Sequence, residues 1–206
     1  PMVIQNGRPI AVDARVVLKP ASVTAPMHLA VSPYPAQYEY RVQLADIGEL
    51  LIRPIRPDDA PLLVELFDTL SPQSIYYRFF TPMKQLSPTM LARFTQIDYD
   101  REMALIAVIK EHTADARFVG VARYVGNPDR RSCEFALTVA DESQRQGIGR
   151  EIMKRLMAVA RDRGMEVMEG EVLSNNSKMI RMCEQLGFRV ARVPEEPDVV
   201  HVRRHL

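Results

Sequence analysis

The sequence predicts an α+β fold in which a mixed central sheet is flanked by helices. Three extended segments at 103–109, 117–125 and 132–139 follow one another through short connections, which indicates an antiparallel meander. Apolar residues at helical spacing occur both before and after these segments. The alternation of strands and helices, without any internal repeat, therefore favours one mixed domain with a short N-terminal appendage.

The composition is that of a soluble globular protein. The chain has 206 residues and 47% hydrophobic content, enough for a full core, and a net charge of +1 gives no general attraction to nucleic acid or membrane surfaces. No apolar stretch approaches the length of a bilayer span, so we expect a cytoplasmic protein. Cys133 and Cys183 lie on apolar stripes and are expected to be core residues, and no metal site is predicted.

The first residues predict a hairpin followed by a linker. Asn6-Gly7 is a turn signal between two extended runs, the second of which reaches Leu18. Four prolines in residues 20–35 disfavour both helix and sheet. We therefore predict three parts: an N-terminal piece at 1–19, a proline-rich and extended segment at 20–45, and the main domain at 46–206.

The first half of the main domain alternates extended and helical segments. Residues 38–44 and 49–55 are extended, and Asp58 and Asp59 have the character of caps for a helix with apolar residues up to Leu70. The aromatic stretch 71–80 is interpreted either as core packing under a loop or as a wall of an acceptor cleft. Ser87-Pro88 starts a short helix.

The second half contains two more amphipathic helices. The first has an apolar stripe and ends at Gly164; a strand at 166–173 follows. Asn176 caps the second helix, which ends at Gly187-Phe188. Final strands are expected at 189–193 and 198–203. The stripe of the first helix consists of Ile148, Ile152, Met153, Leu156, Met157 and Ala160.

A glycine-containing turn at 141–153 joins a strand to a helix, a place where free backbone N–H groups bind anions. Dinucleotide-binding turns need a third glycine, but Ile152 stands there. Nucleoside triphosphate loops need Gly-Lys-Ser/Thr, which is absent. The remaining pattern is Gln144-Arg145-Gln146-Gly147-Ile148-Gly149 between an antiparallel strand and a helix.

This pattern resembles the signature of the GNAT acetyltransferases, Gln/Arg-x-x-Gly-x-Gly/Ala. The segments 176–179, with Asn and Met, and 186–188, Leu-Gly-Phe, strengthen the resemblance. It implies a GNAT fold with strands splayed at an acetyl-CoA site. The N–H groups from Gln146 to Arg150 would hold the pyrophosphate, and backbone groups of the preceding strand the pantetheine arm. The implied cofactor residues are Leu137, Val139, Gln144, Gln146, Gly147, Ile148, Gly149, Arg150 and Asn176.

A narrower resemblance points to the acceptor. The segments 51–59, 70–80 and 98–105 are similar to those of bacterial protein lysine acetyltransferases, in which a GNAT domain is fused to an ADP-forming acyl-CoA-synthetase-like region. Residues 11–16 resemble the last strand of the ATP-grasp part of that region. The resemblance implies a protein substrate with a target lysine, most plausibly an acyl-CoA synthetase. It leaves the oligomeric state open.

Acetyl transfer to lysine needs a general base, because the side chain is an ammonium ion at neutral pH. Glu134 lies in the middle of the strand before the glycine turn, on the face opposite Cys133. We expect it to be partly buried and to act as the base, as the corresponding glutamate does in the enzymes it resembles. The alternative for Glu134 is a structural ion pair with Arg123 or Arg131.

Two other functions are compatible with the sequence. The cofactor half specifies the acyl donor and says little about the acceptor, so a small-molecule amine or a protein N-terminus is the enzymatic alternative. A module that binds acyl-CoA without catalysis is the other. No tyrosine follows Tyr124, so the usual position of a general acid for the departing thiolate is vacant.

Overall fold

The computed structural model describes residues 2–5, 7–12, 32–110, 116–194 and 196–206, and divides the chain into two compact units, 1–32 and 33–206. The first unit contains a hairpin of β1 (Met2–Gln5) and β2 (Arg8–Ala11), paired antiparallel. Gly7 has a φ of 74°, as the tight turn requires. The hairpin is thus confirmed. The predicted continuation of its second strand over 13–18, and the linker at 20–31, lie outside the described residues.

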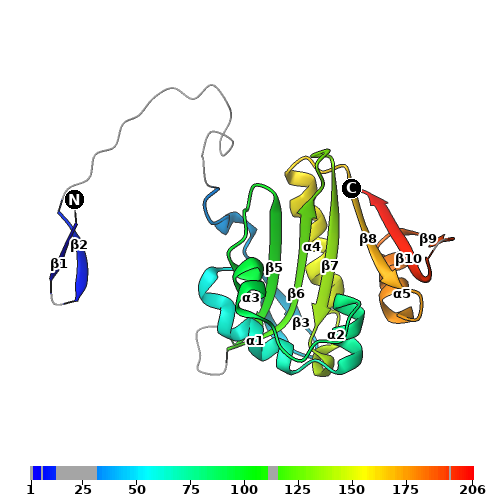
Figure 1. The fold of residues 1–206 in the computed structure, drawn as a ribbon, viewed down its shortest axis with the longest axis horizontal. Helices are drawn as coiled ribbons and strands as arrows, with labels where there is room; N and C mark the ends of the chain where they lie inside the picture. Colours follow the sequence, from blue (N-terminus) through cyan, green and yellow to red (C-terminus); the bar gives the residue numbers. More distant parts are fainter. Residues whose placement is uncertain (1, 6, 13–31, 111–115, 195) are drawn as a thin grey trace. The chain divides into compact units, whose positions relative to one another are not determined.

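The second unit contains one eight-stranded sheet with the order β3-β4-β5-β6-β7-β8-β10-β9 (Figure 1). Neighbours are antiparallel except β7 and β8, which are parallel, so the predicted mixed sheet with its antiparallel meander is confirmed. The strands are β3 (Tyr40–Leu44), β4 (Gly48–Pro54), β5 (Glu102–Ile109), β6 (Arg117–Gly126), β7 (Ser132–Val139), β8 (Val167–Leu173), β9 (Arg189–Val193) and β10 (Glu196–His205).

The compact unit begins earlier in the chain than the predicted boundary at residue 46. Strand β3 forms the edge of the sheet by pairing with β4, from Tyr40 opposite Ile52 to Leu44 opposite Gly48. The extended segment at 38–44 is therefore part of the domain, together with the 3₁₀ helix η1 (Ala36–Tyr38). The composition of this extended segment gave no sign of the strand pairing.

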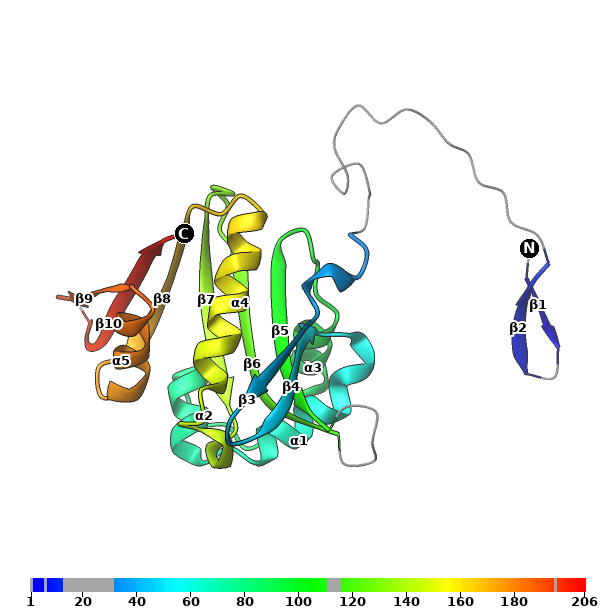
Figure 2. The same cartoon turned by 180° about the vertical axis from the view of Figure 1, so that it is seen from behind.

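Helices cover both faces of the sheet (Figures 1 and 2). The helices α1 (Ala60–Asp68), α2 (Pro72–Phe79) and α3 (Pro88–Thr95) lie on one face, and α4 (Ile148–Asp162) on the other. Helix α5 (Ser177–Gln185) packs beside β9, and two short 3₁₀ helices are η2 (Pro57–Asp59) and η3 (Asp141–Ser143). None of the helices in the described residues is long and apolar enough to cross a bilayer.

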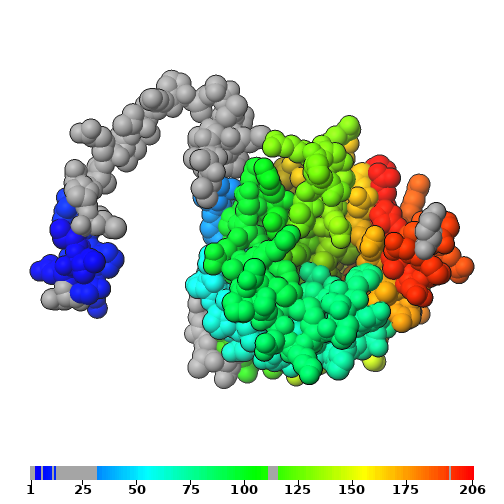
Figure 3. Space-filling model, viewed as in Figure 1, coloured from blue at the N-terminus to red at the C-terminus, as the bar shows by residue number. Residues whose placement is uncertain are grey.

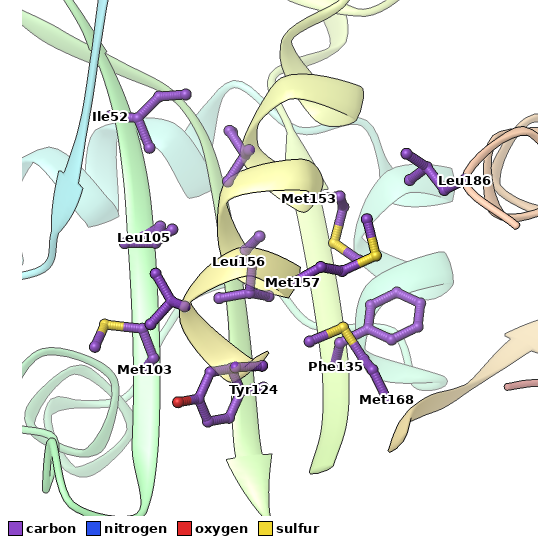
Figure 4. Packing of buried hydrophobic residues seen from close by; sticks show 14 of the residues in the cluster. Ile52, Met103, Leu105, Tyr124, Phe135, Met153, Leu156, Met157, Met168 and Leu186 are labelled. Carbon is purple, nitrogen blue, oxygen red and sulfur yellow. The ribbon is translucent and has the colours of Figure 1, made fainter. Parts of the chain in front are cut away.

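The core on the α4 side follows the predicted stripe. Met153 and Met157 lie on the side of Phe135 and Met168, whereas Leu156 lies on the side of Tyr124 (Figure 4). Buried residues Ile148, Ile152 and Ala160 belong to the same cluster. This face therefore fixes α4, and with it the glycine turn at its N-terminus, against β5, β6 and β7.

Two predictions for the first helices need correction. Residues 72–79 form helix α2 rather than a loop, and Ser71 caps it by accepting a hydrogen bond from the Ser74 N–H at 3.2 Å. Asp59 does not cap α1 through its side chain. Its carboxylate instead binds the Arg53 guanidinium at 2.7 and 2.8 Å and the Arg56 N–H at 2.6 Å. With 5% and 4% exposure, Arg53 and Asp59 form a buried ion pair that joins β4 to the start of α1.

Candidate active site

Strands β7 and β8 separate after a short paired stretch. They are in register only at Ser132, Cys133 and Glu134, opposite Val167, Met168 and Glu169. Beyond Glu134, β7 continues to pair with β6 on its other side. The Ala140 N–H donates to the Val119 carbonyl of β6, so by alternation the N–H and C=O groups of Leu137 and Val139 point toward the gap. The predicted splay is therefore present, with the predicted residues along it.

The glycine turn begins α4 at the end of this gap. Gly147 is the N-cap with a φ of 84°, a conformation that favours glycine, and Arg145 has a φ of 66°. The Gly147 carbonyl accepts the first helical hydrogen bond, from the Glu151 N–H. The N–H groups before Glu151 have no acceptor within the helix, and the helix dipole adds positive potential there. The turn thus presents backbone donors to an anion.

A cleft of about 750 Å³ runs along the gap and the glycine turn. Its volume lies within the range typical of sites for small molecules and cofactors, about 300–1,000 Å³. The basic residues Arg145, Arg150 and Lys178 line it. It also brings together most of the predicted cofactor residues: Leu137, Val139, Gln144, Gly147, Gly149, Arg150 and Asn176.

Two predicted residues lie differently. The Ile148 side chain is 1% exposed and belongs to the core, so that only its backbone can face a ligand. The Gln146 side chain is half-buried and donates to the Glu142 carbonyl at 3.2 Å. Asn176 lines the cleft but also caps α5, accepting from the Met179 N–H at 3.2 Å. Its side chain therefore has a structural role whether or not it contacts a ligand.

Glu134 is exposed, in contrast to the predicted partial burial. Its neighbours in register are Val125 on β6 and Glu169 on β8. It forms neither of the ion pairs considered for it. Arg131 binds Glu166 at 2.7 Å, and Arg123 donates to the Phe94 carbonyl at 2.7 Å. The carboxylate thus remains accessible to a molecule approaching the sheet.

Cys133 faces away from Glu134, into the core. It is fully buried, and its thiol contacts the Val167 carbonyl at 3.6 Å. Burial raises the pKa of the Cys133 thiol to about 12, and that of Cys183 to about 12 as well. Neither side chain is a thiolate at neutral pH, which confirms the interpretation of both as core residues.

Helix α2 forms part of the cleft wall, in agreement with one of the two interpretations of 71–80, although none of its residues was predicted as a site residue. Ser74, Tyr77 and Arg78 line the cleft, and the Tyr77 hydroxyl donates to the Asn175 carbonyl at 3.3 Å across the gap. Their spacing of three and four places them on one face of a helix. The available signal was Ser71-Pro72, the same cap and N1 pair that correctly indicated a helix at Ser87-Pro88.

Comparison with known proteins decides the family. A family model of the acetyltransferase (GNAT) domain matches residues 49–189, more than half of the chain. The chain belongs to the GNAT acetyltransferase family. It is accordingly an acetyl-CoA-dependent N-acetyltransferase, and the fold that the sequence predicted is confirmed.

Individual relatives agree with this assignment. An acetyltransferase of Pseudomonas aeruginosa is 34% identical over 159 residues, which cover 77% of the chain and 85% of that protein. The crystal structure of the GNAT domain of S. lividans PAT superposes with a TM-score of 0.76 at 34% identity, covering 84% of the chain and 100% of that domain. The acetyltransferase Pat of Mycolicibacterium smegmatis is 27% identical over 139 residues, 66% of the chain, which spans only 40% of that relative.

Gly149 offers a test of the cleft in this GNAT domain. A Cβ here would lie 3.3 Å from the Leu137 Cδ2 and the Val139 Cγ2, so α4 begins almost in contact with β7. We expect Gly149→Val to displace the first turn of α4, because such overpacking costs about 1–3 kcal/mol. If this free energy is lost from the anion site, acetyl-CoA should bind about tenfold or more weakly, and titration calorimetry measures the change.

Gly164→Ala is the matched control for Gly149→Val. Gly164, just beyond the other end of α4, has a φ of 81°, and none of the described residues has an atom within 4 Å of the place that a Cβ would take there. Alanine at this position strains the backbone and lowers the melting temperature, but leaves the cleft intact. Unchanged acetyl-CoA affinity in Gly149→Val would show that the first turn of α4 does not contact the cofactor.

Asp141 ties α2 to the glycine turn. Its carboxylate accepts from the Ser71 N–H at 2.8 Å, the Ser74 hydroxyl at 2.5 Å and the Gln144 amide at 2.8 Å. Burial opposes ionisation of Asp141, but the hydrogen bonds from Ser71 and Ser74 outweigh it and hold its pKa below the ordinary value of 3.8. The ionised carboxylate therefore stabilises the fold.

This depressed pKa gives Asp141→Asn a definite pH dependence. Stability from the carboxylate is fully present above pH 3.8 and is lost as the pH falls through the lower, folded-state pKa. We expect the variant to be about 1 kcal/mol less stable at pH 7, allowing for partial exposure. The gap in urea unfolding free energy should close below pH 3.8. A gap independent of pH would contradict the electrostatic explanation.

Proposed function

We propose that this GNAT domain transfers the acetyl group of acetyl-CoA to lysine side chains of proteins, with Glu134 as general base. The acyl donor binds in the large cleft. Backbone N–H groups of the turn from Gln146 to Arg150, with Ile148 contributing its amide alone, hold the pyrophosphate. The positive side chains of Arg145, Arg150 and Lys178 along the cleft support this orientation.

In this arrangement, the pantetheine arm lies along β7. The Leu137 and Val139 backbone groups point into the gap where a β8 neighbour would otherwise bond them, so an amide-containing chain can take the place of the missing strand. Gln144 orients the end of the strand by donating to the Val139 carbonyl at 3.4 Å and to Asp141. The thioester then lies near the middle of β7.

The exposure of Glu134 is the observation that carries the proposal for a protein acceptor. A lysine on the surface of a folded protein can reach this carboxylate without entering a deep pocket, since the Glu134 side chain is exposed. The S. lividans and M. smegmatis relatives, which carry the name Pat, agree with this choice. The acceptor protein is, by this analogy, an acyl-CoA synthetase.

The reaction begins with deprotonation of the lysine side chain. The lysine ammonium, with an ordinary pKa near 10.4, gives a proton to Glu134, directly or through water, and the neutral amine attacks the thioester carbonyl. The carbon–sulfur bond breaks as the amide forms. The nitrogen of the attacking amine releases its second proton to water as the amide forms. The CoA thiolate leaves and takes up a proton from water, and Glu134 returns the first proton to solvent, so that one proton is released overall. No residue of the chain becomes acylated.

The N-terminal unit and the compartment complete the proposal. We propose that residues 1–19 are the end of an ATP-grasp-like part of a fused acyl-CoA-synthetase-like region, as in the enzymes the chain resembles. The two free, buried thiols of Cys133 and Cys183 suit a reducing compartment, and we place the enzyme in the cytoplasm.

Incubation of the purified protein and [¹⁴C]acetyl-CoA with a cell extract tests the function. Label on proteins, located on lysine side chains by mass spectrometry, is the expected result. Label found only on small molecules would show that the acceptor is a metabolite and not a protein lysine. Binding of acetyl-CoA without transfer to either fraction would indicate an acyl-CoA-sensing module.

A further inference from the structure

A second, small cavity lies on the Glu134 face of the sheet, beneath α1, α2 and α3. These helices form the continuous cyan-to-green layer of Figure 3. The cavity measures about 40 Å³, room for about three water-sized groups. Arg78 and Thr138 line both this cavity and the large cleft, so the two adjoin near the C-terminal end of β7.

The walls of the small cavity are apolar except for Thr138 and two guanidinium groups, those of Arg78 and Arg123. The apolar residues include Leu63, Leu66, Phe67, Phe79, Phe94 and Val121. Arg123 is held in place, since it donates to the Phe94 carbonyl at 2.7 Å and lies 4.7 Å from the centre of the Phe94 ring. It therefore contributes a fixed positive charge to one side of the cavity.

Arg78 lacks any comparable polar partner. Its guanidinium lies 4.9 Å from the centre of the Phe79 ring, but within residues 32–110, 116–194 and 196–206 it makes no hydrogen bond or ion pair. Burial, and to a smaller extent the positive charge of Arg123, lower the pKa of Arg78 to about 10, although the negative charge of Glu134 opposes part of this shift. Arg78 remains a cation at neutral pH, with its donors available to a ligand.

Opposite charges thus meet where donor and acceptor must react. Glu134 suits the amine, while Arg78 and Arg123 suit an anion beside it. We propose that the acceptor carries a carboxylate close to its reactive amine, and that Arg78 binds this carboxylate. The inference rests on the proposed function and adds a specificity to it. The cavity admits a group of carboxylate size, and guanidinium is the side chain best matched to carboxylate geometry.

The carboxylate has two possible sources: an acidic residue next to the target lysine, or the α-carboxylate of a free amino acid. Two peptides that differ only in Asp or Asn beside one lysine test the first source. We expect the protein to acetylate the Asp peptide with a kcat/KM about tenfold or more higher, chiefly through a lower KM, since a charge-assisted hydrogen bond is lost with Asn.

Arg78→Gln should bring the ratio between the two peptides close to one, chiefly by raising the KM for the Asp peptide. Arg78→Lys, which keeps the charge, should restore part of the preference. Arg101→Gln is the matched control, because Arg101 is an exposed arginine paired at 4.0 Å with Asp98, and it should leave the ratio unchanged. Thermal melting of each variant checks that it folds.

Several outcomes would overturn the inference. Equal kcat/KM for both peptides with the unmodified protein would show that it does not recognise the carboxylate. An equal fall in kcat/KM for both peptides in Arg78→Gln, not restored in Arg78→Lys, would assign Arg78 a general catalytic or structural role. A different result separates the inference from the proposed function. If only free amino acids are acetylated, and Arg78→Gln raises KM for them but not for the matching amines without a carboxylate, the protein-lysine proposal fails and the carboxylate site stands.

Discussion

Replacing Glu134 by glutamine is expected to lower kcat/KM for acetyl transfer by about 10²–10⁴-fold, the usual contribution of a general base. Glutamine keeps the size and polarity of the side chain but cannot take the proton from the lysine ammonium. Glu134 is exposed, so the substitution leaves no buried group unsatisfied. The melting temperature and the affinity for acetyl-CoA should therefore stay close to those of the unmodified protein, and steady-state rates measure the loss directly.

Glu169→Gln is the matched control for Glu134→Gln. Glu169 is the neighbour of Glu134 in register on β8 and changes the local charge by the same amount. Its carboxylate accepts from the Asn127 amide at 3.0 Å and lies 3.8 Å from both His201 and Arg203, so it is engaged with other side chains. We expect at most a severalfold effect. A full rate in Glu134→Gln, or an equal loss in both variants, would rule out Glu134 as the specific base.

Replacing Asp59 by asparagine is expected to destabilise the domain by about 3–5 kcal/mol, which is the usual effect of removing one partner of a buried ion pair. The Arg53 guanidinium would keep its charge in an environment with 5% exposure while losing the carboxylate that it binds twice. The start of α1 would also lose the carboxylate that the Arg56 N–H bonds. Urea unfolding at pH 7 measures the change.

The adjacent residue supplies the control for the Asp59 substitution. Asp58 is exposed in the same 3₁₀ helix, and Asp58→Asn makes the same chemical change without touching Arg53. Its unfolding free energy should differ from that of the unmodified protein by less than about 0.5 kcal/mol. If the two variants proved equally stable, the Arg53–Asp59 pair would contribute nothing beyond surface electrostatics.

Local patterns predicted the fold well because most of its elements bury one clear face. The α4 stripe and the apolar run of β5 could be interpreted without knowing their neighbours. Strand β3 was placed in a linker because its role depends on pairing with β4 and not on its composition. Asp59 was interpreted as a cap because its sequence position suits one, whereas its actual partner, Arg53, precedes the helix by several residues.

The candidate site also contains one part that the sequence could predict and one part that it could not. The glycine turn is contiguous in sequence, so its residues could be listed in advance, and most of them line the cleft. The contribution of α2 depends on contacts between distant segments, such as that of Ser71 with Asp141 and that of Tyr77 with Asn175. The exposure of Glu134 likewise depends on how distant segments pack around it, and a local sequence pattern contains no information about that packing.

Strands β7 and β8 pair over only a short stretch, so the sheet should open locally along this junction. Strands β8, β10 and β9 are joined to the rest of the sheet by three pairs of residues, whereas β6 and β7 share seven. This junction is the weakest line of the sheet, and the C-terminal strands with α5 form a candidate cooperative unit for hydrogen exchange. A cofactor lying in the gap would bridge that line. Binding and local opening are thermodynamically linked. Any free energy that this bridging adds to acetyl-CoA binding therefore also protects the C-terminal strands from hydrogen exchange, by the same amount.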